Sequence, residues 1–167
     1  MSGNADKGAT PRSDRRTLSR AARLYAVQAL FQMESAGQSA DRVLKEFRTY
    51  RIGAEEAEGV SPEADEALFE RIVGDAVTWQ SKIDQATDRG LVAKWPIDRI
   101  DPVLRALFRA AGAELVTPRT PSRVVITEYV QLAEAFFTEG KEPKFVNAVL
   151  DHVARQLRPD DFAKASN

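Results

Sequence analysis

Helical periodicity is the feature that most limits what this 167-residue chain can fold into. In every long segment the apolar residues recur at steps of three and four, and no segment alternates apolar and polar residues as a strand does. Over residues 17–35, for example, this spacing gathers one apolar face from Leu18, Ala22, Tyr25, Ala26, Ala29, Leu30 and Met33. The pattern predicts an all-α fold.

Capping residues, glycines and prolines divide this pattern into six or seven helices. Ser61-Pro62-Glu63 and Asp101-Pro102 are start signals, because serine and aspartate accept hydrogen bonds from the first turn and proline suits the first helical position. Ser122 is expected to cap a further helix. The expected helices cover residues 17–35, 39–50, 61–89, 92–100, 101–115, 122–137 and 144–157, with a loop over 53–59.

Short connections between these helices predict one helical bundle. We expect a helical domain over residues 15–158, with a flexible basic tail before it (residues 1–14) and a flexible tail after it (residues 159–167). Trp79 and Trp95 are interpreted as core or hinge residues rather than as platforms for nucleobases.

The composition removes most catalytic and metal-binding schemes. The chain has no cysteine and one histidine, His152, with no second ligand candidate near it in the sequence. No Gly-rich phosphate loop and no protease or hydrolase motif is present. Glu128, a carboxylate inside an apolar segment, is interpreted as a structural group. We therefore expect no enzymatic activity, no cofactor and no metal.

No segment of the sequence is typical of a membrane span or of a secretory signal. The longest stretch without a charge, Leu24 to Met33, is much shorter than the roughly 18 residues of a transmembrane helix. Residues 1–14 lack the apolar core of a signal peptide, and the absence of cysteine fits a reducing compartment. We expect a cytoplasmic protein that makes no membrane contact.

Charge is distributed unevenly, although the net charge of the chain is only −1. Residues 1–23 carry six basic and two acidic side chains, whereas residues 54–75 carry eight acidic side chains and one basic. This asymmetry favours a basic end that meets phosphate and an acidic face that points elsewhere. The alternative is an ordinary solvated surface.

The basic end contains an arginine cluster at the start of the first expected helix. Arg16, Arg20 and Arg23 are spaced by four and three residues and therefore share one helical face. Cations gain nothing from the macrodipole at a helix N-terminus, so the cluster, which also includes Arg15, indicates a function. Guanidinium groups and free N–H groups bind phosphate, and arginine stacks on unpaired bases. The structural alternative pairs these arginines with the acidic residues of 55–75.

The chain resembles the NusB family in four blocks that occur in the family's order. Residues 20–31, RAARLYAVQALF, resemble the family's opening helix, and residues 97–115 are similar to its RAILRLAxYEL helix. Residues 121–133 resemble PxxVAINEAVELA, and KFVNAVLD at residues 144–151 nearly reproduces KFVNGVLD. The four matches lie within residues 15–158.

This resemblance implies an all-helical fold of two three-helix units and a role as a transcription antitermination factor. The family binds the single-stranded boxA element of ribosomal-operon RNA together with a small-subunit ribosomal protein, NusE. The pair acts on RNA polymerase, with other Nus factors, to suppress termination. Carried over to this sequence, the resemblance implies an RNA-binding surface of Arg15, Arg16, Arg20, Arg23, Gln28, Phe31, Lys144 and Phe145. For Phe31 and Phe145 the alternative is core packing.

The resemblance also places contacts with NusE on the helix over 101–115. The residues expected there are Val103, Leu104, Leu107, Phe108 and Glu114. The chain departs from the family pattern at Leu104, Ala113, Thr127 and Tyr129. The acidic run from Glu55 to Glu70 is therefore an alternative docking face for the partner.

Two other functions remain open from the sequence. The chain is also consistent with a free-standing relative of the NusB-like domain that precedes ribosomal-RNA methyltransferases. It is equally consistent with a helical protein–protein adaptor, or with a homodimer that hides its RNA-binding face.

Overall fold

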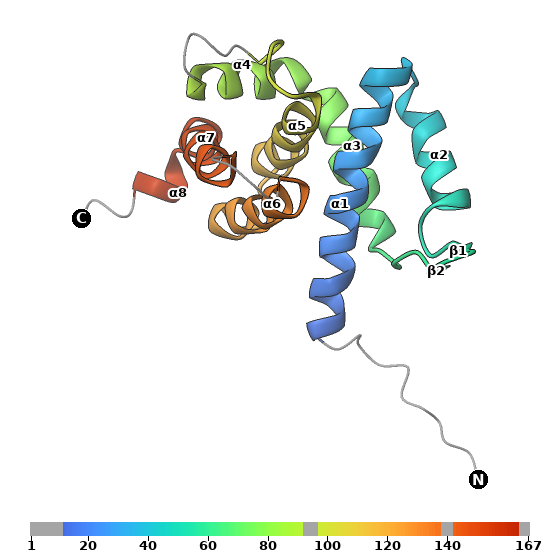
Figure 1. Cartoon of the computed structure of the whole chain (residues 1–167). Coiled ribbons are helices and arrows are strands. Elements are labelled where there is room, and N and C mark those ends of the chain that lie inside the picture. Colours follow the sequence, from blue (N-terminus) through green and yellow to red (C-terminus); the bar gives the residue numbers. More distant parts are fainter. Residues whose placement is uncertain (1–11, 92–96, 138–141, 164–167) are drawn as a thin grey trace.

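The computed structural model describes residues 12–91, 97–137 and 142–163 and is almost entirely helical in these ranges (Figure 1). The prediction of an all-α fold is confirmed. The elements are α1 (Arg12–Ala36), α2 (Ala40–Tyr50), β1 (Glu55–Glu56), β2 (Gly59–Val60), α3 (Glu66–Thr78), α4 (Gln80–Gly90), α5 (Pro102–Val116), α6 (Ser122–Phe136), α7 (Glu142–Leu157) and α8 (Asp160–Ala163).

The helices form two groups that meet at α5. Helices α1, α2 and α3 pack against one another, and α4, α6 and α7 pack around α5 on its other side (Figure 1). α5 itself also contacts α1 and α3. Because α5 is surrounded, it is buried along most of its length, from Leu104 to Leu115.

Aromatic side chains anchor each group. In the first group the ring of Phe47 lies 6.2 Å from Tyr25 and 5.6 Å from Phe69, measured between ring centroids. In the second group Phe108 of α5 meets Phe145 of α7 edge to face at 6.2 Å. Edge-to-face and offset pairs at these distances add to the stabilisation from apolar burial.

The start signal predicted at Ser61-Pro62-Glu63 is wrong, because α3 begins at Glu66 and Asp65 caps it through a 3.0 Å hydrogen bond from the Leu68 N–H. The backbone of Ser61 and Pro62 makes hydrogen bonds outside α3 instead. The Ser61 N–H donates to Ala54 O at 2.8 Å, and the Pro62 carbonyl accepts from the Tyr25 hydroxyl, also at 2.8 Å. The loop expected over 53–59 contains β1 and the first residue of β2. These two strands pair in an antiparallel hairpin of two residues each.

The single helix expected over 61–89 is broken at Trp79, whose backbone leaves the helical region at φ −108° and ψ 16°. The break lets α4 turn away from α3 and pack against α5 and α7. The Trp79 side chain is 41% exposed, so of the two interpretations offered for it, hinge and core, the structure favours the hinge. Trp95 lies outside the described residues, as does most of the short helix expected over 92–100; residues 97–100 form a turn.

Helical structure extends into both segments expected to be tails. α1 already begins at Arg12, and α8 follows Arg158 at the other end. Arg158 is buried and donates to the carbonyls of Leu115, at 2.7 Å, and Thr117, at 3.2 Å. These carbonyls at the end of α5 have no partner within the helix, so the arginine holds the end of the chain in place. Ser122 was expected to cap α6, but its hydroxyl donates to Asp161 at 2.6 Å instead.

We expect Gly112→Ala to lower the free energy of unfolding by about 1–3 kcal/mol, the usual cost of overpacking a core. A Cβ at Gly112 in α5 would collide with the Ile83 side chain of α4. Gly74→Ala is the matched control, because nothing lies within 4 Å of a Cβ at this other helical glycine. Removing glycine there is expected to stabilise the protein by up to about 1 kcal/mol. Urea unfolding of both variants measures the difference, and equal effects would contradict close α4–α5 packing.

Candidate nucleic-acid interface

The first half of α1 presents arginines to solvent. Arg15, Arg16 and Arg20 are exposed, and Arg15 and Arg16 form no ion pair with any residue that the structure describes. The Arg20 side chain is 47% exposed, and its Nε lies 3.1 Å from a carboxylate oxygen of Glu128. Because that contact uses Nε, the terminal N–H groups of Arg20 remain available for a second anion.

Arg23 has a different environment from the other three arginines. It is only 6% exposed and forms a two-point ion pair with Glu114 of α5, at 2.8 and 3.1 Å. Tyr129 of α6 donates its hydroxyl to the same carboxylate at 2.7 Å. Burial alone would lower the pKa of Arg23, but the Glu114 carboxylate raises it above its usual range. Burial and pairing therefore remove Arg23 from the exposed face on which the sequence placed it.

The structure also shows which acidic residues pair with the arginines of α1. Arg20 and Arg23 pair with Glu128 of α6 and Glu114 of α5. Neither carboxylate belongs to the acidic run of residues 55–75, as the structural alternative proposed. Glu128 itself is buried, so the interpretation of Glu128 as a structural group agrees with its ion pair.

A hollow of about 410 Å³ opens beside the second half of α1. Phe31, at 38% exposure, lies on its wall. This exposure distinguishes Phe31 from the core residues of α1, several of which are fully buried. The walls of the hollow are formed by Val27, Gln28, Phe31, Gln32, Ser35, Arg51, Val103 and Phe136.

Arg51 was missed by the sequence analysis. Its Nη2 lies 3.4 Å from the side-chain oxygen of Gln28, and its guanidinium carbon lies 4.7 Å from the centroid of the Phe47 ring. Arg51 follows the last residue of α2 and belongs to no periodic pattern, so the sequence carries no signal for its place beside Gln28. The structure adds a cation to the aromatic hollow.

Arg16, Arg20 and Phe31 form one stripe along α1. Each residue of an α-helix turns by roughly 100°, so Arg16, Arg20, Leu24 and Phe31 fall within a sector about 80° wide. From Arg16 to Phe31 the stripe covers about 22 Å at 1.5 Å per residue. The stripe therefore has guanidinium groups that can bind phosphate at one end and the partly exposed ring of Phe31 at the other.

Lys144 and Phe145 lie at the start of α7, and the structure separates their environments. Lys144 is exposed, whereas Phe145 is partly buried with its ring against Phe108. This geometry favours core packing for Phe145, the alternative left open by the sequence. α7 follows α6, whose last residue, Phe136, lines the hollow beside Phe31.

The residues expected to contact the protein partner are mostly inside the fold. Leu104, Leu107, Phe108 and Glu114 are buried because α5 is surrounded by other helices, and Glu114 is occupied by Arg23. Val103 is the exception, since it lines the hollow beside Phe31. α5 cannot offer this set of residues as one surface.

The fold and this surface define a class: a helical binding protein with a basic and aromatic face. In the part of the chain that the structure describes, no cluster of three histidine, aspartate or glutamate side chains is arranged to hold a metal. No helix there combines the length and apolar character needed to cross a membrane.

Comparison with known proteins identifies the particular family. The sequence profile of the NusB family matches residues 20–155. The transcription antitermination protein NusB of Maricaulis maris is 48% identical over 154 residues, covering 92% of this chain and 96% of the relative. The NusB protein of Granulibacter bethesdensis is 46% identical over 157 residues, with 90% and 96% covered. The chain belongs to the NusB family.

Solved structures agree with this assignment. NusB of T. maritima has a TM-score of 0.69 and 27% identity, covering 93% of this chain and 99% of that one. A NusB chain in a complex of the antitermination factors NusB and NusE with double-stranded RNA has a TM-score of 0.64 and 26% identity, with 82% and 96% covered. The relatives are named for a role in transcription rather than for a catalysed reaction, in line with the predicted absence of enzymatic activity.

Proposed function

We propose that this protein is a transcription antitermination factor that binds boxA-type single-stranded RNA of ribosomal RNA operons together with the ribosomal protein NusE. The pair would act on RNA polymerase, with other Nus factors, to suppress termination, which requires that the protein work in the cytoplasm. The observation that carries the proposal is the exposed stripe on α1, with arginines at one end and Phe31 at the other. The names of the relatives and the solved NusB–NusE complex with RNA support it.

The proposed RNA-binding surface is a revised form of the one implied by the resemblance. It keeps Arg15, Arg16, Arg20, Gln28, Phe31 and Lys144 and adds Arg51. It leaves out Arg23, which is buried in its ion pair, and Phe145, which packs on Phe108. Each retained side chain reaches solvent or the hollow of about 410 Å³.

The chemistry of the stripe suits a single strand better than a duplex. Guanidinium groups bind backbone phosphates without regard to sequence, whereas Phe31 needs an unpaired base on which to stack. The amide of Gln28 and the fork of Arg51 stand beside the ring and are suited to a base edge. The solved NusB–NusE complex contains double-stranded RNA, so a duplex of the same sequence is an informative competitor in binding assays.

Binding of RNA should depend steeply on salt. With about four phosphate contacts, the slope of log K against log salt is expected to be about −3 for a single strand. Replacing Arg16 and Arg20 together by alanine should flatten this slope by roughly one unit or more, because two cationic contacts are lost. Fluorescence anisotropy with a boxA-like RNA at several salt concentrations measures the change.

Arg42→Ala is the control for this experiment, because Arg42 is an exposed arginine on α2, which begins beyond the far end of α1. It should leave the slope unchanged. An unchanged slope in the Arg16 and Arg20 variant would remove α1 from the RNA path. Equal affinity for boxA-like and scrambled RNA would instead favour the adaptor or the homodimer as the function.

A further inference from the structure

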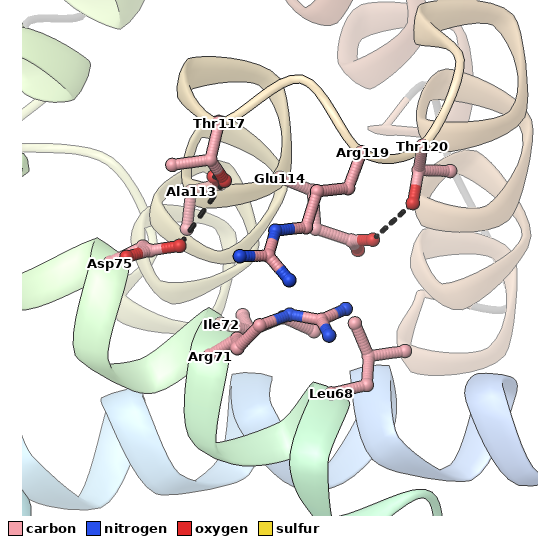
Figure 2. A pocket seen from close by; sticks show the side chains of 9 residues that line it. All are labelled: Leu68, Arg71, Ile72, Asp75, Ala113, Glu114, Thr117, Arg119 and Thr120. Carbon is pink, nitrogen blue, oxygen red and sulfur yellow. Dashed lines mark hydrogen bonds between the residues drawn. The ribbon is translucent and has the colours of Figure 1, made fainter.

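A second pair of arginines converges at a place that the proposed RNA-binding stripe does not include. Arg71 comes from α3 and Arg119 from the turn between α5 and α6, and both line one small hollow. Figure 2 shows both side chains reaching into it, with the Arg119 guanidinium ending on the side of Asp75 and the Arg71 guanidinium on the side of Leu68. Both side chains are exposed, and neither forms an ion pair with any residue that the structure describes. Two cations that line one hollow repel each other, and a bound anion would relieve that repulsion.

The two carboxylates that line the hollow are already engaged. Glu114 is held by the buried Arg23 and by Tyr129, so its charge is balanced inside the fold. Asp75 accepts from the hydroxyl of Thr117 at 3.2 Å, beside the hollow (Figure 2). The charge of Asp75 offsets only one of the two arginines. Arg71 and Arg119 therefore leave a net positive charge at the mouth of the hollow.

The size of the hollow limits what it can receive. On the measure that gives 410 Å³ for the hollow beside Phe31, its volume is only about 10 Å³. A base or a nucleoside does not fit in a space of that size, which is close to that of one water. A phosphate group at the mouth fits the chemistry, because its oxygens can accept from both guanidinium forks.

Two contacts tie the walls of the hollow to the first half of α1. The backbone N–H of Asp65, the cap of α3, donates to Leu18 O at 3.1 Å, so α3 lies against this part of α1. Arg23, about 140° around α1 from Leu18, is bound to Glu114 on the wall of the hollow. By helical geometry, Arg15 lies between the directions of Leu18 and Arg23. Arg15 therefore points from the stripe toward the side of α1 on which Arg71 and Arg119 meet.

We propose that Arg71 and Arg119 form a second phosphate-binding site, which holds a backbone phosphodiester of an RNA strand that continues past Arg15 from the α1 stripe. This inference rests on the proposed function and extends it by giving the strand a direction across α3 and the α5–α6 turn. The contact is to phosphate, so it adds affinity without reading sequence.

The test compares Arg71→Gln/Arg119→Gln with the unchanged protein on two RNAs. One RNA is a boxA-like core. The other is the same core with a single-stranded flank at each of its two ends. We expect the double variant to bind the flanked RNA on the order of tenfold more weakly, because charge-assisted hydrogen bonds to one phosphate are lost. The slope of log K against log salt should flatten by about 0.7, the value for one phosphate contact of a single strand. Binding of the short core should stay unchanged, and the loss should be the same for flanks of different sequence.

Two controls separate this site from general electrostatics. Arg42→Gln/Arg89→Gln removes the same charge from α2 and α4, at exposed arginines whose side chains form no ion pair or hydrogen bond with any described residue. Equal weakening by this variant would overturn the site, and so would unchanged binding of the flanked RNA by the Arg71 and Arg119 variant. Weakening that occurs only when NusE is present would assign the arginines to a protein contact and would also overturn it. Failure of the unchanged protein to bind either RNA would count against the proposed function itself. Circular dichroism of each variant confirms that the fold is retained.

Discussion

Arg23→Met is expected to lower the free energy of unfolding by about 3–5 kcal/mol, the usual cost of removing one partner from a buried ion pair. Glu114 would keep its charge at 5% exposure, with the Tyr129 hydroxyl as its main remaining partner. Arg20→Met should cost less, about 1 kcal/mol, because the Arg20 side chain is 47% exposed and its partner Glu128 keeps some access to water at 11%. Urea unfolding of the two variants, with the slopes compared for two-state behaviour, measures the difference.

The double variant Arg23→Met/Glu114→Met completes this experiment. Removing both charges together should recover much of the lost stability, since a buried ion pair and a well-packed apolar pair are often nearly equivalent. RNA binding gives an independent measurement: Arg20→Met should weaken it and the folded double variant should not. A small stability loss in Arg23→Met accompanied by a flatter salt slope would return Arg23 to the RNA-binding surface.

The case of Arg23 explains where sequence reasoning about this surface succeeds and where it fails. The spacing of Arg16, Arg20 and Arg23 correctly indicates one side of α1. It cannot indicate which of the three is covered, because that depends on α5, which contributes Glu114 from 91 residues away. One local signal was present: Arg23 stands directly beside the buried Ala22, one turn before the buried Ala26 and Val27.

The departures from the family pattern at Ala113 and Tyr129 have a common structural context. Both side chains are buried, and the Tyr129 hydroxyl donates to Glu114, the residue next to Ala113. The family pattern has its tyrosine at the position of Ala113 and an alanine at the position of Tyr129. The two changes therefore affect one buried cluster and leave the outer surface of the protein unaltered.

Secondary structure was predictable wherever the apolar spacing itself determines it. The periods of α1, α5 and α7 and the Asp101-Pro102 start of α5 suffice, and Asp101 accepts from the Val103 N–H as expected. The break at Trp79 was not predictable, since neither glycine nor proline marks it. It follows from tertiary packing, which turns α4 toward α5 and α7. The late start of α3 depends in the same way on tertiary contacts, because the Tyr25 hydroxyl of α1 binds the Pro62 carbonyl.

NusE is expected to tighten the binding of boxA-like RNA by about 5–150-fold, the range of usual coupling free energies between two ligands. The reason lies in the charge of the chain: its net charge is −1, and the exposed arginines of α1 form only a short stripe. A basic ribosomal protein docked beside the stripe would add positive charge and lengthen the path for the strand. Anisotropy with and without equimolar NusE measures the effect, and equal affinities would refute joint binding.

The association and dissociation rates of NusE locate the docking face. Most of the α5 residues considered for this role are buried. Two candidates are left: the exposed acidic hairpin, with Glu55, Glu56 and Glu58, and the Val103 wall of the hollow whose Gln28, Phe31 and Arg51 are proposed to meet RNA. Reversing the three hairpin charges to lysine should slow NusE association, most strongly at low salt, if the hairpin steers a basic partner. Val103→Asp, at the edge of the hollow, should instead speed dissociation if NusE packs there, because a charge would be buried against an apolar contact. A variant that changes neither rate removes its surface from the interface. Because one surface acts on the association rate and the other on the dissociation rate, the two rates together distinguish steering by the hairpin from packing in the hollow.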